Sequence, residues 1–77
     1  MAVENDKLHI RLHVYDTELP VTVRPEDEPY CRNAAKLITE KVNSLMEIYR
    51  TSRSEKEIIR MAMLDIAIDL EFERSTN

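Results

Sequence analysis

The most apolar stretch of the chain runs from Ile58 to Leu70, where ten of thirteen residues are apolar and only Arg60, Asp65 and Asp69 are polar. A surface helix of a small monomer needs one apolar stripe, whereas a helix that is apolar nearly all round must be covered on several sides. A strand is disfavoured because buried strands run about 4 to 8 residues and prefer β-branched and aromatic side chains. The pattern therefore predicts a helix that needs extensive cover.

A second copy of the chain is the cover that we favour for this helix. A domain of this size buries a modest fraction of its surface, so its stability often depends on disulfides, metal or oligomerisation. The alternative is that the stretch is the central helix of a monomeric core. The predicted dimer interface consists of the apolar residues of the stretch, which are Ile58, Ile59, Met61, Ala62, Met63, Leu64, Ile66, Ala67, Ile68 and Leu70.

Near the N-terminus, alternating apolar and polar residues predict a β-hairpin over residues 7–24. The first alternation covers residues 7–15 and the second covers 19–23, with a polar interruption at 16–18. Pro20 cannot donate to a strand ladder, so the second strand must have an open edge there. A hairpin is barely stable alone, so its apolar face needs a helix or further strands. That face consists of Leu8, Ile10, Leu12, Val14, Leu19, Val21 and Val23.

The first predicted helix covers residues 26–49. Apolar residues recur there at steps of three and four from Tyr30 to Tyr49, which gives one stripe facing the core. Asp27 is expected to cap this helix, and acidic residues in its first turn favour the positive end of the helix dipole.

The second predicted helix covers residues 55–74, after a polar connection at 50–54. Ser54 with Glu57 fits a capping box, and so does Ser52 with Glu55, so two start registers are open. Residues 1–6 are expected to form a flexible N-terminus. The predicted fold is thus a single α+β domain over residues 1–77, an N-terminal β-hairpin followed by two α-helices, the second one long and forming an oligomer interface.

Composition narrows the functional classes. The 77 residues carry a net charge of −4, which opposes a general nucleic-acid binder because phosphate neutralisation needs clustered basic residues. The absence of Gly excludes nucleotide sites built on Gly-rich phosphate loops. The lone Cys31 rules out an internal disulfide and suits a reducing compartment. Neither a signal peptide nor a run of about 20 apolar residues is present, so we expect a cytoplasmic protein without a membrane partner.

Residues that could carry chemistry are few. His9 and His13 share a face of the first strand but lie about 13 Å apart, too far to bind one metal ion. Asp65 and Asp69 are one helical turn apart, but no nucleophile or histidine accompanies them. We expect these carboxylates to form a structural polar seam, for which Arg60 of another chain is a candidate partner. The sequence thus predicts no enzyme, with no catalytic residue, metal or cofactor.

Positive charge gathers around the connection between the two helices, at Arg50, Arg53, Lys56 and Arg60. A run of exposed charges is usually a solvated surface. The functional alternative is a docking patch for an acidic partner. A small dimeric nucleic-acid-binding or adaptor module using this Arg50–Arg60 patch is the alternative function.

The order of elements, together with the run from Met63 to Leu70, resembles the ZapA family of bacterial cell-division proteins, which associate with the tubulin-like GTPase FtsZ. In that family the second helix carries a run like Ala-Leu-Asn-Ile-Ala-x-Glu-Leu, matched here by Met-Leu-Asp-Ile-Ala-Ile-Asp-Leu. Residues 8–14 resemble the family's first strand, and residues 34–42 its first helix. The resemblance covers about residues 8–72.

The resemblance implies a homodimer, with the second helix as the start of a coiled coil and a tetramer formed from two dimers. Such proteins cross-link FtsZ filaments and promote the division ring at midcell. The family commonly has Gly and a basic residue at the hairpin turn, where this chain has Asp16 and Thr17. The candidate replacements for partner binding are the basic residues Arg11, Arg24, Arg50, Arg53 and Lys56.

Overall fold

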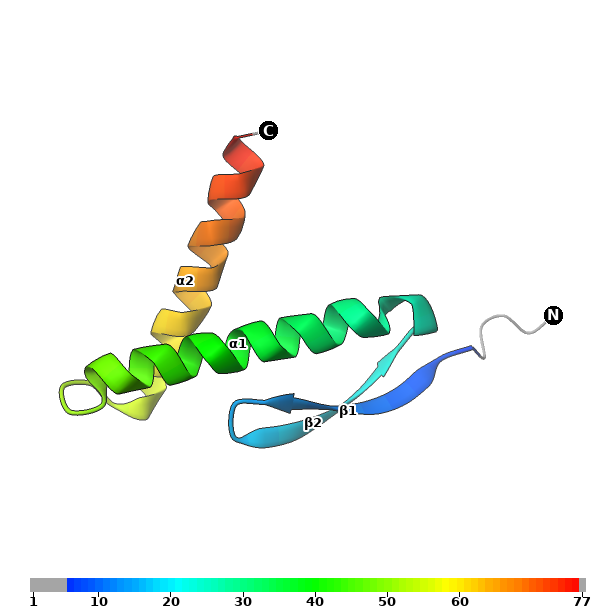
Figure 1. The fold of residues 1–77 in the computed structure, drawn as a ribbon, viewed down its shortest axis with the longest axis horizontal. Helices are drawn as coiled ribbons and strands as arrows, with labels where there is room; N and C mark the ends of the chain where they lie inside the picture. Colours follow the sequence, from blue (N-terminus) through cyan, green and yellow to red (C-terminus); the bar gives the residue numbers. More distant parts are fainter. Residues whose placement is uncertain (1–5, 77) are drawn as a thin grey trace. The chain divides into compact units, whose positions relative to one another are not determined.

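The computed structural model describes residues 6–76 and consists of a two-stranded antiparallel hairpin followed by two helices, which confirms the predicted α+β fold (Figure 1). The strands are β1 (Leu8–Val14) and β2 (Thr17–Val23), and the helices are α1 (Glu28–Tyr49) and α2 (Glu55–Ser75). The expected flexible N-terminus at 1–6 falls almost entirely outside the described residues. The chain divides into two compact units between Thr39 and Glu40.

The hairpin is tighter than the sequence pattern predicted. Val14 pairs with Thr17, so the loop consists of Tyr15 and Asp16 alone, and β2 begins two residues before the expected Leu19. Tyr15 has a left-handed backbone with φ of 58°, which a two-residue hairpin loop commonly requires. The prediction missed this turn because residues other than Gly seldom adopt positive φ, so a Tyr gives no indication of a tight turn.

The first unit contains the hairpin and the first part of α1, and its buried residues are Leu12 and Ala35. Figure 1 shows the hairpin running along this part of α1. Burial is greater on β1 than on β2, and Leu19 is 48% exposed although we expected it on the buried face. A single helix therefore covers the first strand more fully than the second.

The start of α1 also differs from its prediction. Residues 25–27 form a 3₁₀ turn, and α1 begins at Glu28 rather than at residue 26. Asp27, the expected cap, accepts a hydrogen bond from the Arg24 side chain at 3.1 Å instead. Pro25 occupies the first position of the 3₁₀ turn, where its missing N–H costs nothing.

The second unit contains the remainder of α1 and the whole of α2, and its core consists of Val42, Ile58 and Ala62. The capping box that starts α2 uses Ser54 and Glu57, which decides between the two registers. The Glu57 N–H donates to Ser54 Oγ at 3.2 Å, and the Ser54 N–H donates to Glu57 Oε1 at 3.1 Å. The helix therefore begins at a fixed residue, and that fixes which of its faces meets α1.

Candidate association surfaces

The residues predicted for a dimer interface divide into buried and exposed groups. Ile58 is completely buried and Ala62 nearly so, because they pack in the core of the second unit. These two residues are already covered within one chain and are not accessible to a second copy. The surface left for association is made by the other apolar residues of α2.

Apart from the half-buried Met61, those residues form two stripes that flank the buried face of α2. One stripe contains Ile59, Met63, Ile66 and Leu70, which follow steps of four and three residues. Residues separated in this way lie on one side of a helix. Met63 and Leu70 are exposed, whereas Ile59 and Ile66 are partly covered.

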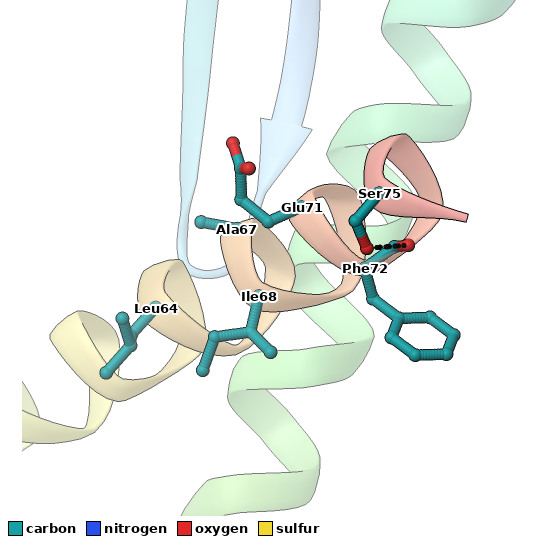
Figure 2. Close-up of a pocket in the computed structure, with 6 residues that line it drawn as sticks. All are labelled: Leu64, Ala67, Ile68, Glu71, Phe72 and Ser75. Atoms are coloured by element: carbon teal, nitrogen blue, oxygen red, sulfur yellow. Dashed lines mark hydrogen bonds between the residues drawn. The ribbon is translucent and has the colours of Figure 1, made fainter. Parts of the chain in front are cut away.

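The second stripe contains Leu64, Ala67 and Ile68 and continues to Phe72, beyond the predicted interface. Leu64 is 62% exposed and Phe72 is 68% exposed, which is unusual for side chains of this size. With Glu71 and Ser75 these residues line a shallow, largely apolar hollow on α2 (Figure 2). The sequence prediction missed Phe72 because the apolar run stops at Leu70, although its four-residue step from Ile68 was a usable signal.

A second hollow lies between the end of α1 and α2 within the same unit. Leu45 and Tyr49 of α1 line it together with residues of α2, which are Met61, Leu64, Asp65 and Ile68. Leu64 and Ile68 therefore border both hollows. These two side chains are therefore accessible from both hollows.

The aspartates of α2 have different environments. The Lys41 Nζ atom lies 3.1 Å from Asp65 Oδ2, so this carboxylate pairs with α1 of its own chain rather than with Arg60 of another chain. Asp69 is exposed and has no ion pair in the described part of the chain. The expected polar seam is thus a single ion pair between the two helices of one unit.

The basic residues predicted to bind a partner also differ from one another. Arg24 is engaged locally, since its Nε atom lies 3.1 Å from Asp27 Oδ2 and 3.9 Å from Glu26 Oε2. Arg11, on the outer face of the hairpin, is exposed and has no carboxylate partner among residues 6–76. The same is true of three residues at the connection between the helices, which we call the basic corner: Arg50, Arg53 and Lys56.

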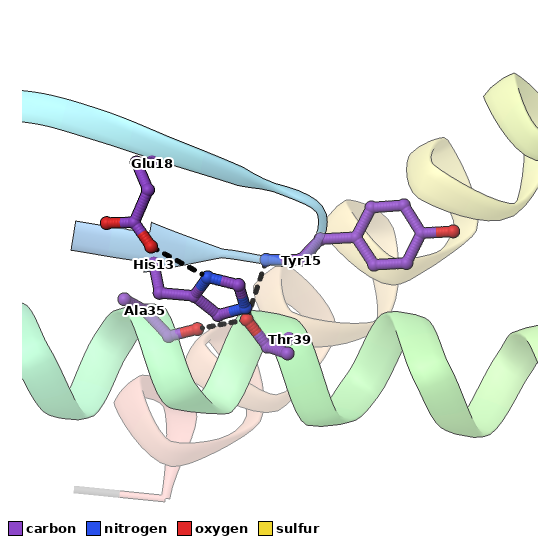
Figure 3. Close-up of polar contacts among 5 residues, drawn as sticks. All are labelled: His13, Tyr15, Glu18, Ala35 and Thr39. Carbon is purple, nitrogen blue, oxygen red and sulfur yellow. Dashed lines mark hydrogen bonds and ion pairs between the residues drawn. The ribbon is translucent and has the colours of Figure 1, made fainter.

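The tip of the hairpin is fixed to α1 by a chain of hydrogen bonds (Figure 3). The Tyr15 N–H donates to Thr39 Oγ1 at 2.7 Å, and that hydroxyl donates to the Ala35 carbonyl at 2.9 Å. The residue that precedes Asp16 and Thr17 is thus held by a hydrogen bond from its backbone to a side chain of α1. The sequence prediction did not identify Thr39, because nothing local marks a residue that pairs 24 positions away.

Other candidate groups remain separate. His13 Nδ1 lies 3.1 Å from Glu18 Oε2, and His9 Nδ1 lies 3.0 Å from Thr22 Oγ1, so each histidine has its own cross-strand partner. Cys31 is a half-buried free thiol. Among the residues that the structure describes, no three metal-ligating side chains come together. Neither helix, as far as the chain is described, has the length and apolarity that crossing a bilayer requires.

Comparison with known proteins identifies the family. Neither a curated protein nor a solved structure gives a significant match to the chain. The family model described as cell division protein ZapA, however, matches residues 10–77, which include most of β1, the whole of β2 and both helices. The match confirms the resemblance seen in the second helix, and the chain belongs to the ZapA family of non-enzymatic cell-division proteins.

Proposed function

We propose that this protein binds FtsZ filaments as a homo-oligomer and joins neighbouring filaments, which promotes division-ring assembly in the cytoplasm at midcell. The observation that carries the proposal is the pair of exposed apolar stripes on α2 in a chain of the ZapA family. A contiguous exposed apolar surface on a soluble domain typically marks an association site. We assign self-association to α2 and filament binding to basic surfaces elsewhere.

Oligomerisation is central to this mechanism. A monomer with one binding surface would decorate a filament, whereas an assembly with two or more surfaces can hold two filaments at once. Linking two sites makes the second binding event intramolecular, so weak individual contacts give strong overall attachment. The dimer is the minimum assembly with this property, and a tetramer formed from two dimers would increase it.

The basic corner is our leading candidate for the filament contact. Arg50, Arg53 and Lys56 are exposed and unpaired in the described chain, so binding an acidic surface breaks no existing ion pair. Arg11 is a further candidate for the same reason. Arg24 is a weaker one, because two neighbouring carboxylates already offset its charge.

Co-sedimentation with FtsZ and GTP tests the proposal, with the mass of the free protein measured by light scattering in the same buffer. We expect the protein to pellet with FtsZ and to increase the recovered filament mass. Arg53→Glu should reduce pelleting, whereas Lys36→Glu, a matched charge reversal on exposed α1, should not. A protein that stays in the supernatant at low salt refutes filament binding.

Nucleic-acid binding is the second candidate, and the same unpaired cations of the basic corner favour it. The net charge of −4 opposes it, since the rest of the chain repels phosphate. Fluorescence anisotropy of labelled DNA and RNA at low salt decides the matter, because charge contacts are strongest there. We expect no change in anisotropy; saturable binding would favour this second candidate.

A further inference from the structure

The two edges of the hairpin differ in their backbone chemistry. Pro20 of β2 lies opposite Arg11 of β1 and has no N–H, so at this pair the backbone groups of both residues point away from the other strand. The outer edge of β2 is therefore blocked at its centre, which is a common way for a sheet to prevent further pairing. β1 contains no proline, so its outer edge lacks this protection.

The outer edge of β1 has backbone groups that are available for pairing. In an antiparallel ladder the N–H and C=O of every second residue point away from the partner strand. Counting from Arg11, these residues are His9, Arg11 and His13, and no backbone hydrogen bond reaches them from elsewhere in the described chain. Tyr15 continues this set, and its N–H donates to Thr39 of α1 rather than to β2 (Figure 3). Thus α1 closes this edge at the hairpin tip and leaves the stretch from His9 to His13 open.

Burial shows that β1 already has the position of a central strand. Leu12 of β1 is 8% exposed, whereas Leu19, its partner on β2, is 48% exposed. The helix α1 therefore covers β1 rather than the middle of the two strands. A strand added beside β1 would give a three-stranded sheet with β1 at its centre, which removes the weakness of a lone hairpin.

The side chains along the open edge determine the chemistry of the strand that fits it. His9, Arg11 and His13 share the outer face of the hairpin, and all three are exposed. His13 has a partner on β2, since its Nδ1 atom lies 3.1 Å from Glu18 Oε2. Arg11 instead faces Pro20 and has no carboxylate partner in the described chain. An acidic residue opposite Arg11 on an added strand would supply that partner, because opposite charges on neighbouring strands attract.

A second copy of β1 fits this edge less well than an acidic segment does. Two β1 strands paired antiparallel about Arg11 would place Arg11 opposite Arg11 and His9 opposite His13, so basic side chains would face each other along the edge. A segment that alternates acidic and apolar residues avoids this conflict. Its acidic side chains would lie on the outer face beside Arg11, and its apolar side chains would lie on the inner face beside Ile10 and Leu12.

We propose that the open edge of β1 binds an extended acidic segment of a partner protein as an added antiparallel strand, with an acidic side chain opposite Arg11. Backbone hydrogen bonds to His9, Arg11 and His13 provide the affinity, and the alternating side chains provide the selectivity. The site uses neither α2 nor the basic corner. It therefore adds a binding surface to the function proposed above and does not depend on self-association.

The test follows the fluorescence anisotropy of an amidated peptide, Glu-Val-Glu-Val-Glu-Val-Glu with fluorescein at its N-terminus, mixed with the full chain at low salt. We expect saturable binding, which Arg11→Glu should weaken about tenfold, because it replaces an attraction by a repulsion. Lys36→Glu, a charge reversal on exposed α1, should change binding by less than about twofold. A peptide that does not bind refutes the proposal.

Backbone methylation separates strand addition from attraction between charges alone. In the proposed pairing the residue opposite Arg11 exchanges both backbone hydrogen bonds with it, so the N–H groups of the Glu residues point toward β1. Methylating these nitrogens keeps the charge of the peptide but should abolish binding. Methylating the Val nitrogens, which point away from β1, should leave binding within about threefold of the original. Equal binding of the two methylated peptides overturns strand addition.

Amide hydrogen exchange measured by NMR locates the contact on the chain. The N–H groups of His9 and Arg11 should exchange freely in the free protein and about tenfold more slowly with the peptide bound. Those of Ile10 and Leu12, which point toward β2, should change little and serve as the internal control. If His9 and Arg11 are instead protected in the free protein, increasingly so at higher protein concentration, a second copy occupies the edge and the proposal is wrong.

Discussion

Ile58 and Ile48 offer a matched test of which apolar residues of the second unit hold the fold. Ile58 is completely buried, whereas Ile48 on α1 is 65% exposed. Ile58→Ala removes three carbon groups, each contributing about 0.8 kcal/mol when buried, and leaves a cavity that adds to this loss. We expect the free energy of unfolding to fall by about 3 kcal/mol, which is a large part of the roughly 4–12 kcal/mol typical of a 77-residue chain.

The assay is urea unfolding followed by far-UV circular dichroism, at one protein concentration for all variants because self-association stabilises the folded state. In thermal unfolding of the same samples, the melting temperature of Ile58→Ala should fall by about 12–24 °C, at roughly 4–8 °C per kcal/mol. Ile48→Ala removes the same atoms from the surface and should change stability by less than about 0.5 kcal/mol. Equal losses in the two variants would refute the assignment of Ile58 to the core.

Three further predictions concern polar contacts and use the same assay. Ser54→Ala removes the cap of α2 and should cost about 1 kcal/mol, whereas Ser52→Ala, outside the capping box, should cost less. Asp65→Asn breaks the partly exposed pair with α1 and should cost only about 0.2–1 kcal/mol, with the loss smaller at high salt; a loss equal to that of Asp69→Asn would mean that the pair contributes nothing. Thr39→Val removes the hydroxyl that accepts the hydrogen bond from the Tyr15 N–H and should lower the free energy of unfolding by about 1–3 kcal/mol; an unchanged midpoint would show that water replaces the hydroxyl.

The elements of the fold were predictable because each has a strong local signal. The alternation before Tyr15 predicted β1, and the apolar run from Ile58 predicted α2. Ser54 and Glu57 limited the start of α2 to two registers, one of which the structure has. These signals depend on residues within four positions of each other, and such short-range patterns are what a sequence displays directly.

The same pattern did not predict which apolar residues of α2 point into the core and which point outward. A helix that is apolar nearly all round has no single preferred direction, so Ile58 and Leu64 look equivalent in sequence. The structure separates them, since Ile58 is fully buried and Leu64 is largely exposed. The ion pair between Lys41 and Asp65 was not predictable either, because it joins residues on different helices that no local motif connects.

The division of α2 into a buried face and exposed apolar stripes separates the residues that hold the fold from those available for association. Ile58 and Ala62 are committed to the core of one chain, so a change there should destabilise the fold, whereas a change at Leu64 should weaken association of a folded chain. In the function that we propose, self-association through α2 leaves the basic corner of Arg50, Arg53 and Lys56 exposed for the filament.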